Sequence, residues 1–472
     1  MTEGMLEAIE HRGPDSIRHH RTQHFYGSVR ASELSAARGD GFAQDGNIAV
    51  LFDGEIYNAR NDARSDAEVA LRLYKKYGRT FAGHLEGVFA CAVCDGDTVV
   101  LARDAVGVRP LYWGTTDHGD MCFASEAKAL IGVSGNVAEL PPAATCSSKT
   151  GLAGYLPRYP AVAMGETFEE AAKTLRVALS RAVGRRLEDG AVGACLLSGG
   201  LDSSIIAAIA RELGAGIPLV TVGMEGAPDL DSAKIMAEHL GMEHHVFLYD
   251  AEQIRRSVPR AVWMLESFDE DCVSGAISNL FASAKAGEFT NCILSGEGGD
   301  ELFGGYHLLK DLPTEAERLK MMDRLIEIAH NTAVQRLDRA MMGNSVNYRT
   351  PFIDTAVIAL ALQIPVRWKI HETGSGRLVE KHILREAFKD LLPETIYRRE
   401  KLRFAAGTGT DNLMDDVAAG QANAGEFSQA SRTTAEGYTL NSPKELWYYK
   451  LFKEKFRAPC FEKLVGRWDP GK

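Results

Sequence analysis

Residues 195–210, CLLSGGLDSSIIAAIA, place glycine, hydroxyl and acidic side chains where an apolar strand should give way to a helix. The two glycines allow a sharp turn and the close approach of a ligand. The amides of such a loop and the helix N-terminus behind it favour an anion. Ser198, Ser203 and Ser204 would add hydroxyl donors. Asp202 would repel a phosphate unless a cation lay between them, so the loop predicts bound Mg²⁺.

This loop is not a Walker motif, because it lacks Gly-Lys-Ser/Thr. It resembles instead the SGGxDS pyrophosphate loop of the ATP pyrophosphatases. That resemblance implies cleavage of ATP between its α- and β-phosphates and an acyl-adenylate intermediate.

A second glycine-rich stretch, NCILSGEGGDELFGGYH, spans residues 291–307. Ser295 and Gly296 end its apolar run, and Glu297, Asp300 and Glu301 follow. If both apolar runs are strands of one parallel sheet, their ends face the same crevice. Acids in that crevice suit Mg²⁺ binding or general-base work on an attacking amine.

Two basic stretches could complete the site. GRLVEKHILREAF, residues 376–388, predicts a helix with Lys381 and Arg385 one turn apart on one face. YRREKLRFAAGTGTDN, residues 397–412, predicts a basic loop that contains Lys401. A lysine over an acyl-phosphate would stabilise charge that develops in the transition state. A solvated surface is the alternative interpretation of both stretches.

The elements that position the two glycine-rich loops alternate between strand and helix. From residue 167 to residue 249, helical and apolar segments follow one another, which indicates a parallel sheet covered on both faces. Beyond about residue 310 the pattern is mainly helical. We therefore expect an α/β domain over 163–472.

The first part of the chain has a different texture. Residues 20–140 contain short apolar runs separated by turn signals, typical of antiparallel sheet, with a hairpin at 96–97. A helix is expected from Ser65 or Asp66 to Gly78. We expect an α+β domain over 1–150. The stretch from about 135 to 162 is rich in Pro, Ser, Gly and Ala and predicts a linker.

Composition narrows the class of protein. The 472 residues include 45% hydrophobic and 25% charged residues, with a net charge of -11. This profile indicates a soluble globular protein and argues against a general binder of nucleic acid or membranes. No signal peptide or membrane-spanning run is recognisable, and eight scattered cysteines suggest reduced thiols in the cytoplasm. The Cys91–Cys94 pair is interpreted as strand packing, not as a zinc site.

Together these motifs resemble those of the glutamine-hydrolysing asparagine synthetases. The resemblance covers nearly the whole chain and rests on motifs in order: HRGPDS (11–16), LFDGEIYN (51–58), SDAEV (65–69), ARDAVGVRPLYW (102–113), LSGGLDSS (197–204), LSGEGGDELFGGY (294–306), YRTPFID (348–354), VEKHILREAF (379–388) and RREKLRF (398–404).

The resemblance implies two domains and two half-reactions. An N-terminal-nucleophile (Ntn) glutaminase domain would release ammonia from glutamine. A parallel-sheet ATP-pyrophosphatase domain, of the adenine nucleotide α-hydrolase type, would adenylate the side-chain carboxylate of aspartate with ATP and Mg²⁺. Ammonia would then displace AMP. The implied small-molecule partners are aspartate, ammonia or glutamine, and ATP. A homodimer is one oligomeric state compatible with the resemblance.

The resemblance also assigns roles to individual residues. Glu297 would be the base for ammonia, and Lys401 would stabilise the adenylation transition state. Asp202 and Asp300 would hold Mg²⁺, and Asp300 would also face the substrate. The residues that would bind the nucleotide are Leu196, Ser198, Gly199, Gly200, Asp202, Ser203, Ser204, Val222, Ser295 and Gly296. Those that would bind glutamine are Arg30, Gly54, Glu55 and Asp66.

The glutaminase half departs from the family pattern. Relatives use an N-terminal cysteine, carried by a strand upstream of the helix that precedes His11, whereas this chain begins Met-Thr and offers Thr2. Asp53 stands where relatives have an asparagine that donates to the oxyanion, and an ionised carboxylate cannot donate. A start assigned too late and a genuine loss of glutaminase activity both account for this pattern. We expect glutamine hydrolysis to be absent from the chain as given.

The synthetase half departs too. Relatives suggest an arginine near Ser274 and a proline near Ser278. An arginine could bind a substrate carboxylate. Three hypotheses therefore stay open: asparagine synthesis from aspartate; activation of another carboxylate for attack by an amine, as in β-lactam synthetases and lasso-peptide cyclases; and a non-catalytic relative that binds ATP.

Overall fold

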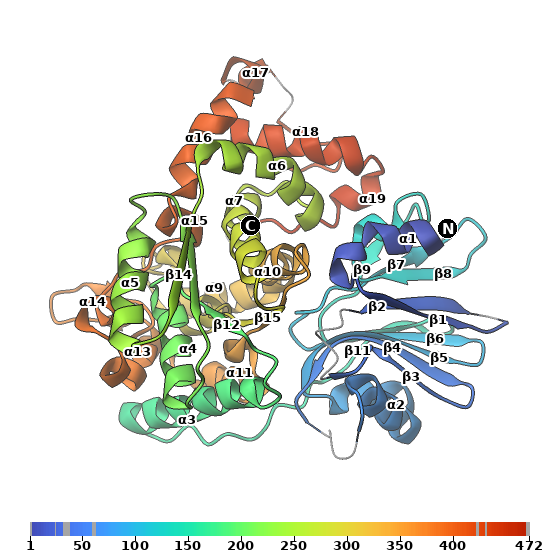
Figure 1. The fold of residues 1–472 in the computed structure, drawn as a ribbon, viewed down its shortest axis with the longest axis horizontal. Helices are drawn as coiled ribbons and strands as arrows, with labels where there is room; N and C mark the ends of the chain where they lie inside the picture. The colour runs from blue at the N-terminus through green and yellow to red at the C-terminus, as the bar shows by residue number, and fades with distance from the viewer. Residues whose placement is uncertain are drawn as a thin grey trace.

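The computed structural model describes residues 2–23, 25–31, 38–58, 63–421, 424–429 and 432–468. The chain folds into two units that lie side by side (Figure 1). The N-terminal unit contains antiparallel sheets, and the larger C-terminal unit contains a parallel sheet surrounded by helices. Both expected fold types are therefore confirmed, in the expected order along the chain.

The described elements of the N-terminal unit are α1 (Thr2–Ala8), β1 (Ser16–Arg21), β2 (Tyr26–Ala31), β3 (Phe42–Asp45), β4 (Ile48–Ile56), α2 (Asp66–Tyr77), β5 (Gly87–Asp95), β6 (Thr98–Arg103), β7 (Tyr112–Thr115), β8 (Met121–Ala124), β9 (Ala138–Glu139), β10 (Ala144–Ser147) and β11 (Gly151–Gly154). Among them, six strands form an antiparallel sheet in the order β11-β10-β6-β5-β4-β3. The β8-β7-β9 sheet and the β1-β2 hairpin lie between this sheet and α1, and α2 covers the other side (Figure 1).

Strand β4 shows why this sheet has two buried faces. Val50 and Phe52 pack in one hydrophobic cluster with residues of α2, whereas Leu51 packs in the cluster on the other face. This alternation follows from the two-residue period of side chains along a strand. The Ser65 hydroxyl accepts a hydrogen bond from the Glu68 amide at the start of α2, which confirms the expected N-cap.

The linker prediction for residues 135–162 is wrong over much of its length. β9, β10 and β11 lie within it, and β10 and β11 extend the six-stranded sheet. Gly151, with a φ of +73°, ends the turn between these two strands. Cys146 is fully buried in the core next to this sheet. Small and turn-forming residues here make a tight hairpin; the irregular connection runs from residue 155 to residue 165.

The C-terminal unit begins with α3 (Phe168–Leu187), β12 (Ala194–Leu196), α4 (Leu201–Glu212), β13 (Leu219–Gly223), α5 (Pro228–Leu240), β14 (His244–Leu248), α6 (Ala251–Leu265), α7 (Glu270–Ala286), β15 (Cys292–Leu294), α8 (Gly299–Phe303) and, later in the chain, β16 (Asn347–Arg349). The five strands pair in parallel in the order β14-β13-β12-β15-β16. β12 and β15, which precede the two glycine-rich loops, are therefore neighbours.

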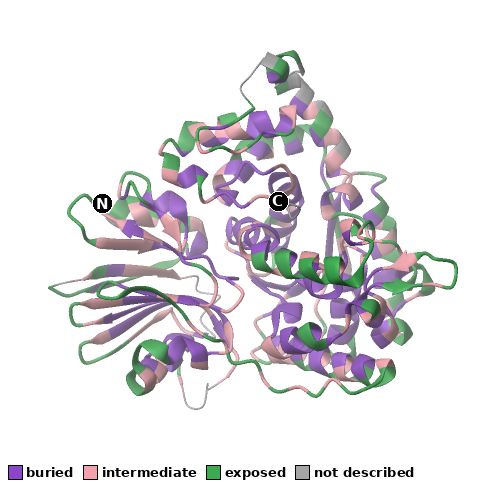
Figure 2. Ribbon diagram, turned by 180° about the vertical axis from the view of Figure 1, so that it is seen from behind, coloured by how far each residue is buried: buried purple, intermediate pink, exposed green. Residues whose placement is uncertain are grey.

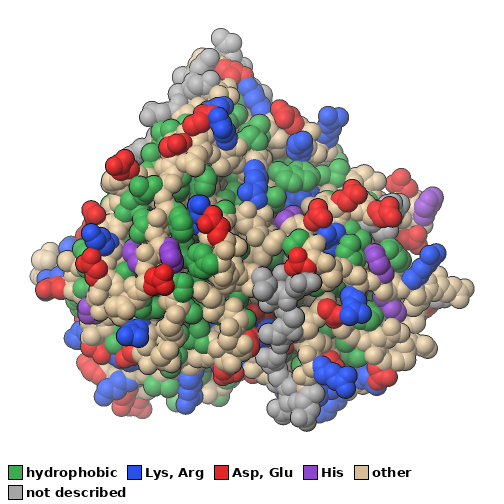
Figure 3. Space-filling model, viewed as in Figure 1, with side chains coloured by type: hydrophobic (Ala, Val, Ile, Leu, Met, Phe, Trp, Pro, Cys, Tyr) green, Lys and Arg blue, Asp and Glu red, His purple; other side chains and the backbone are tan. Residues whose placement is uncertain are grey.

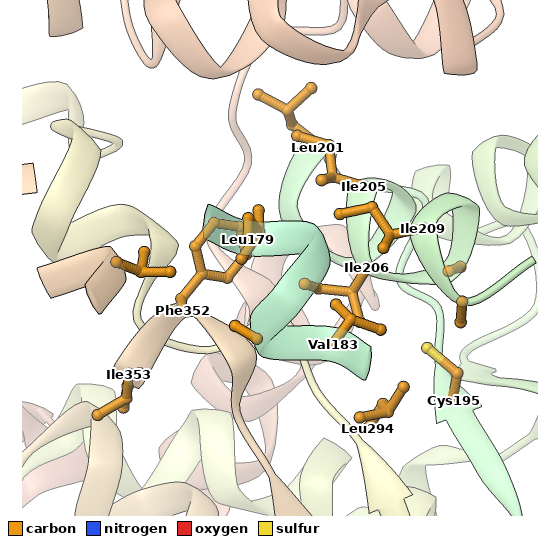
Figure 4. Packing of buried hydrophobic residues seen from close by; sticks show 14 of the residues in the cluster. Leu179, Val183, Cys195, Leu201, Ile205, Ile206, Ile209, Leu294, Phe352 and Ile353 are labelled. Carbon is orange, nitrogen blue, oxygen red and sulfur yellow. The ribbon is translucent and has the colours of Figure 1, made fainter. Parts of the chain in front are cut away.

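The core of this unit fixes where α4 begins and points. In Figure 4, Ile205, Ile206 and Ile209 of α4 lie close to Leu179 and Val183 of α3. All five side chains are fully buried. Figure 2 shows the same pattern at lower magnification, with the sheet buried and the outer helices exposed on one side. An apolar helix packed in this way holds its first turn rigidly at the end of β12.

The rest of the chain is mainly helical, as expected. It contains α9 (Glu315–Ile328), α10 (Ala333–Met342), α11 (Thr355–Gln363), α12 (Val366–Lys369), the short strands β17 (His371–Glu372) and β18 (Leu378–Val379), α13 (His382–Phe388), α14 (Glu394–Tyr397), α15 (Phe404–Gly407), α16 (Thr410–Gln421), α17 (Ala424–Gln429), α18 (Pro443–Lys455) and α19 (Pro459–Glu462). Searched over the described ranges, the helices include no segment that is long and apolar enough to cross a lipid bilayer.

Charged side chains are interspersed on the surface, whereas between the two units they form buried ion pairs. On the face in Figure 3, acidic and basic side chains are interspersed. Between the units, Arg12 and Arg109 donate to the two oxygens of Asp338, at 2.7 and 3.2 Å from Nη1 of each arginine. Arg349 Nε donates to Glu55 Oε1 at 3.0 Å. All five side chains are buried, so these ion pairs join the units through a region with little solvent.

Asp338→Ala should destabilise the folded protein by about 3–5 kcal/mol, because it removes the buried carboxylate that Arg12 and Arg109 share and leaves Arg109 with only a longer contact to Asp53. Burial alone would raise the pKa of Asp338, but Arg12 and Arg109 outweigh it and hold that pKa below its ordinary value. The stabilisation is therefore present above the pKa of an unfolded aspartate and is lost as the pH falls through the folded pKa.

Urea unfolding at pH 7 and at decreasing pH would measure this effect. The difference between wild type and variant should shrink toward acid. Asp311→Ala, at an exposed position, is the control. Equal unfolding midpoints for both variants at pH 7 would contradict the prediction.

Candidate functional site

The two glycine-rich loops meet at the carboxyl ends of β12 and β15. A Cβ atom built on Gly296 would lie 2.7 Å from the Ser203 backbone nitrogen, and one on Gly299 would lie 2.7 Å from Asp202 Oδ1. Such distances leave no room for a side chain, so glycine is required for the loops to touch. The expectation that both loops face one crevice is confirmed.

A cavity of about 440 Å³ opens where these loops meet. That volume lies within the range of ligand pockets in proteins. Ten of the twelve residues expected on the nucleotide side line it: Leu196, Ser198, Gly200, Asp202, Ser203, Val222, Ser295, Gly296, Asp300 and Lys401. Glu297 also lines it. Gly199 and Ser204 are not among the described lining residues.

The first loop is shaped by its own hydroxyl groups. Ser203 Oγ accepts a hydrogen bond from the Ser198 amide at 3.2 Å, and Ser198 Oγ accepts one from the Gly200 amide at 3.3 Å. Gly199 has a φ of +68°, and a Cβ on it would lie 2.4 Å from the Ala233 backbone nitrogen. Gly199 is thus needed for the turn and for contact with α5. The first turn of α4 begins at Leu201, directly behind the loop.

Two lysines hold the acids at the junction of the loops. Lys381 contacts both Asp202 and Asp300, and its Nζ lies 2.5 Å from Asp300 Oδ1. Lys401 Nζ donates to Asp300 Oδ2 at 2.6 Å. Burial would raise the pKa of Asp300, but the two lysines hold it below its ordinary value. Burial would likewise lower the pKa of Lys401, but Asp300 and Asp202 raise it.

Glu297 occupies a different electrostatic environment from Asp300. Burial raises the pKa of Glu297, and the neighbouring Asp300 adds to the rise, against the opposing effect of Arg336. Arg336 Nη2 donates to Glu297 Oε1 at 3.1 Å. A carboxylate with a raised pKa takes up a proton more readily than Asp300, whose pKa is lowered. Glu301 turns away and accepts from the Tyr306 hydroxyl.

The acids at the junction fit Mg²⁺ only together with ligand oxygens. Asp202 Oδ1 is buried and has no hydrogen-bond partner among the described residues. Within the same residues, no group of three His, Cys, Asp or Glu side chains forms a metal site. Mg²⁺ is usually bound through one or two carboxylates plus substrate phosphates and water. Asp202 and Asp300 satisfy that requirement.

The four residues expected to bind glutamine line a separate cavity of about 1100 Å³, formed mostly by the N-terminal unit but also lined by Asn347 and Arg349 of the C-terminal unit. The three charged ones are already engaged. Glu55 pairs with Arg349, Asp66 lies 3.4 Å from Arg38 Nη1, and Arg30 Nη2 lies 3.1 Å from Glu10 Oε1. The fourth, Gly54, has a φ of +138° and allows close contact with β5.

Asp53 in this cavity is also part of an ion pair. Its Oδ2 accepts from Arg12 Nη2 at 3.0 Å, and its Oδ1 lies 3.7 Å from Arg109 Nε. The expected single helix before His11 is two segments, α1 and a 3₁₀ turn at Glu10–Arg12. The 3₁₀ turn carries Arg12 toward Asp53. The carboxylate at position 53 is therefore fixed by cations and offers no hydrogen-bond donor.

The helix expected over residues 376–388 is wrong in its first half. β18 occupies Leu378–Val379, and α13 begins only at His382. Lys381 has a φ of +54°, so it precedes the helix in a left-handed conformation and reaches the acids alone. Arg385 instead donates to the Arg399 carbonyl at 2.9 Å. Lys381 and Arg385 thus serve different groups.

Sequence reasoning missed two other groups in this cavity. Arg336 comes from the amphipathic helix α10, where a charged residue is unremarkable by pattern. Arg399 Nη2 donates to Asp229 Oδ1 at 2.6 Å, which anchors the segment that carries Lys401 to the start of α5. The RREKLRF motif was the available signal for Arg399; no signal in the sequence marked Arg336.

Comparisons with known proteins agree with this two-part architecture. A family model described as asparagine synthase matches residues 174–328 and 310–460, and one described as a glutamine amidotransferase domain matches residues 1–148. The chain is 32% identical over 505 residues to a glutamine-hydrolysing asparagine synthetase of Triphysaria versicolor, covering 97% of this chain and 83% of that protein. It is 30% identical over 503 residues to one of Zea mays (98% and 84% covered), and 30% identical over 498 residues to asparagine synthetase B of Escherichia coli strain K12 (97% and 88% covered).

Proposed function

The chain belongs to the asparagine synthetase family, and from that membership we propose that it makes asparagine from aspartate, ammonia and ATP. The side-chain carboxylate of aspartate attacks the α-phosphorus of ATP, forming an acyl-adenylate and releasing pyrophosphate. Ammonia then attacks the acyl carbon, loses a proton, and displaces AMP. The single observation that carries the proposal is the contact between the two glycine-rich loops, Gly296 and Gly299 against Ser203 and Asp202.

Each residue at the junction has a task in this scheme. The amides and hydroxyls of residues 198–203 bind the pyrophosphate. Asp202 and Asp300 would hold Mg²⁺, which would neutralise charge on the phosphates. Lys401 stays protonated, because its pKa is raised, and stabilises negative charge on the phosphates as pyrophosphate departs. Glu297, with its raised pKa, accepts the proton from the attacking ammonia.

We propose that ammonia comes from solution and not from glutamine. Asp53 cannot donate to an oxyanion, and loss of such a donor costs about 10²–10³ in rate. Glu55 is held by Arg349 and Arg38, so a glutamine that bound to Glu55 would have to compete with two guanidinium groups. Asp53 and the ion pairs of Glu55 therefore both oppose glutamine hydrolysis.

With aspartate and MgATP, ammonium chloride should therefore support asparagine formation, and glutamine should not exceed the rate without a nitrogen donor. Chromatography of amino acids together with a pyrophosphate assay would measure both. Asp53→Ala, in the other cavity, should leave the ammonium-dependent rate of the folded protein unchanged within error. Asparagine formed from glutamine at a rate comparable with ammonium would contradict this part of the proposal.

A second candidate is activation of another carboxylate. The observation that favours it is the uncharged Ser274, near which relatives suggest an arginine. Acid-dependent pyrophosphate release from a panel of carboxylic acids would distinguish it from aspartate use.

We also propose a cytoplasmic location, since the eight cysteines are free thiols.

A further inference from the structure

Arg336 reaches the cavity through a gap left by a glycine. It extends from α10 across α7 at Gly275, where a Cβ atom would lie 2.9 Å from Arg336 Cδ and 3.1 Å from its Nη1. Gly275 and Arg336 both line the same cavity as the two glycine-rich loops. The missing side chain at position 275 thus lets a guanidinium group lie beside the loop junction.

This guanidinium group has unused hydrogen-bonding capacity. Nη2 donates to Glu297, but Nε is buried without a partner among the described residues. A buried N–H without a partner is energetically unfavourable, so a ligand that accepts a hydrogen bond from it would be stabilised. An arginine presents its donors in a planar fork that matches a carboxylate. The Arg336 guanidinium group can therefore bind the carboxylate of a ligand in addition to Glu297.

The other arginines that line the cavity, Arg385, Arg399 and Arg403, are also paired with protein carboxylates, but none of them has a buried N–H without a partner among the described residues. Arg399 donates to Asp229 at 2.6 Å, and Arg403 donates to Asp271 at 2.6 Å. Ser274, one residue before Gly275, carries no charge. Among the described arginines that line this cavity, Arg336 of α10 is thus the one with a buried N–H that has no hydrogen-bond partner.

We infer that Arg336 binds the carboxylate of the acceptor that does not react, and so restricts the acceptor to amino-dicarboxylic acids. This inference rests on the proposed function and adds the residue that selects the substrate. With Glu297 on the same guanidinium group, the acceptor would be held next to the base that receives the proton from ammonia.

The test compares aspartate with β-alanine, which is aspartate without its α-carboxylate. Pyrophosphate release would be measured for wild type, Arg336→Met and the control Arg324→Met, an exposed arginine of α9. Losing charge-assisted hydrogen bonds to one carboxylate corresponds to about 10- to 100-fold. In Arg336→Met, the ratio of kcat/KM for aspartate over β-alanine should fall by that factor, through KM for aspartate. ATP affinity from calorimetry should stay within about threefold.

If Arg336 had only a structural role, Arg336→Met would lower kcat/KM for aspartate and for β-alanine equally. An unchanged ratio of the two values would therefore overturn the inference. If Arg336→Met fails to fold, Gly275→Ala provides the second variant. It adds a better helix former to α7 but displaces the guanidinium group. It should lower the same ratio. A wild-type protein that releases no pyrophosphate with aspartate would contradict the proposed function itself, which is a different outcome from an unchanged ratio.

Discussion

Asp202→Asn is expected to lower the rate of pyrophosphate release by about 10²–10³-fold. The substitution keeps the shape of the side chain but removes the negative charge that pairs with Lys381 and that we propose binds Mg²⁺. ATP would lose part of its charge neutralisation at the β- and γ-phosphates. Steady-state assays at saturating MgATP, aspartate and ammonium would measure the effect.

Asp231→Asn is the matched control, because Asp231 lies at an exposed position on the neighbouring helix α5. It should retain the wild-type rate. The Asp202 variant should also need a higher concentration of Mg²⁺ to reach its own maximal rate. Full activity in Asp202→Asn at low Mg²⁺ would show that the first glycine-rich loop, residues 198–204, is not the site of pyrophosphate release.

Lys401→Met should have an effect of similar size, about 10²–10³-fold on the adenylation step. The lysine forms its ion pair with Asp300, and that contact places its charge at the junction of the two glycine-rich loops. Because its pKa is raised, the charge persists through neutral and mildly alkaline pH. Wild-type activity should consequently not fall in that range through loss of this proton.

Exchange between labelled pyrophosphate and ATP isolates the adenylation step from attack by ammonia. Lys455→Met, at an exposed position in α18, supplies the control. ATP binding, measured by calorimetry, should weaken far less than the rate. If the two quantities dropped in parallel, Lys401 would act in ATP binding and not in the transition state.

The part of the site that could be predicted from sequence is the part built from local signals. Each glycine-rich loop carries its own strand, turn and helix start within about fifteen residues, so its shape depends on nearby backbone. The pairing of β12 with β15 also follows from rules for parallel sheets. The linker error had a local cause as well: Pro-, Ser- and Ala-rich composition does not distinguish an irregular connection from a tight hairpin such as β10-β11.

The remaining features depended on contacts between distant segments. Glu55 belongs to a motif that implied a glutamine site, yet it meets Arg349, 294 positions away in the chain. Lys381 reaches Asp202 across 179 positions because a left-handed residue starts α13. Arg336 gained a place in the cavity because Gly275 on another helix has no side chain. The sequence alone determined the family, the two domain types and the two loops. The packing of separate elements decided which charges meet, since an ion pair depends on the distance between side chains in space and not on their spacing in the chain.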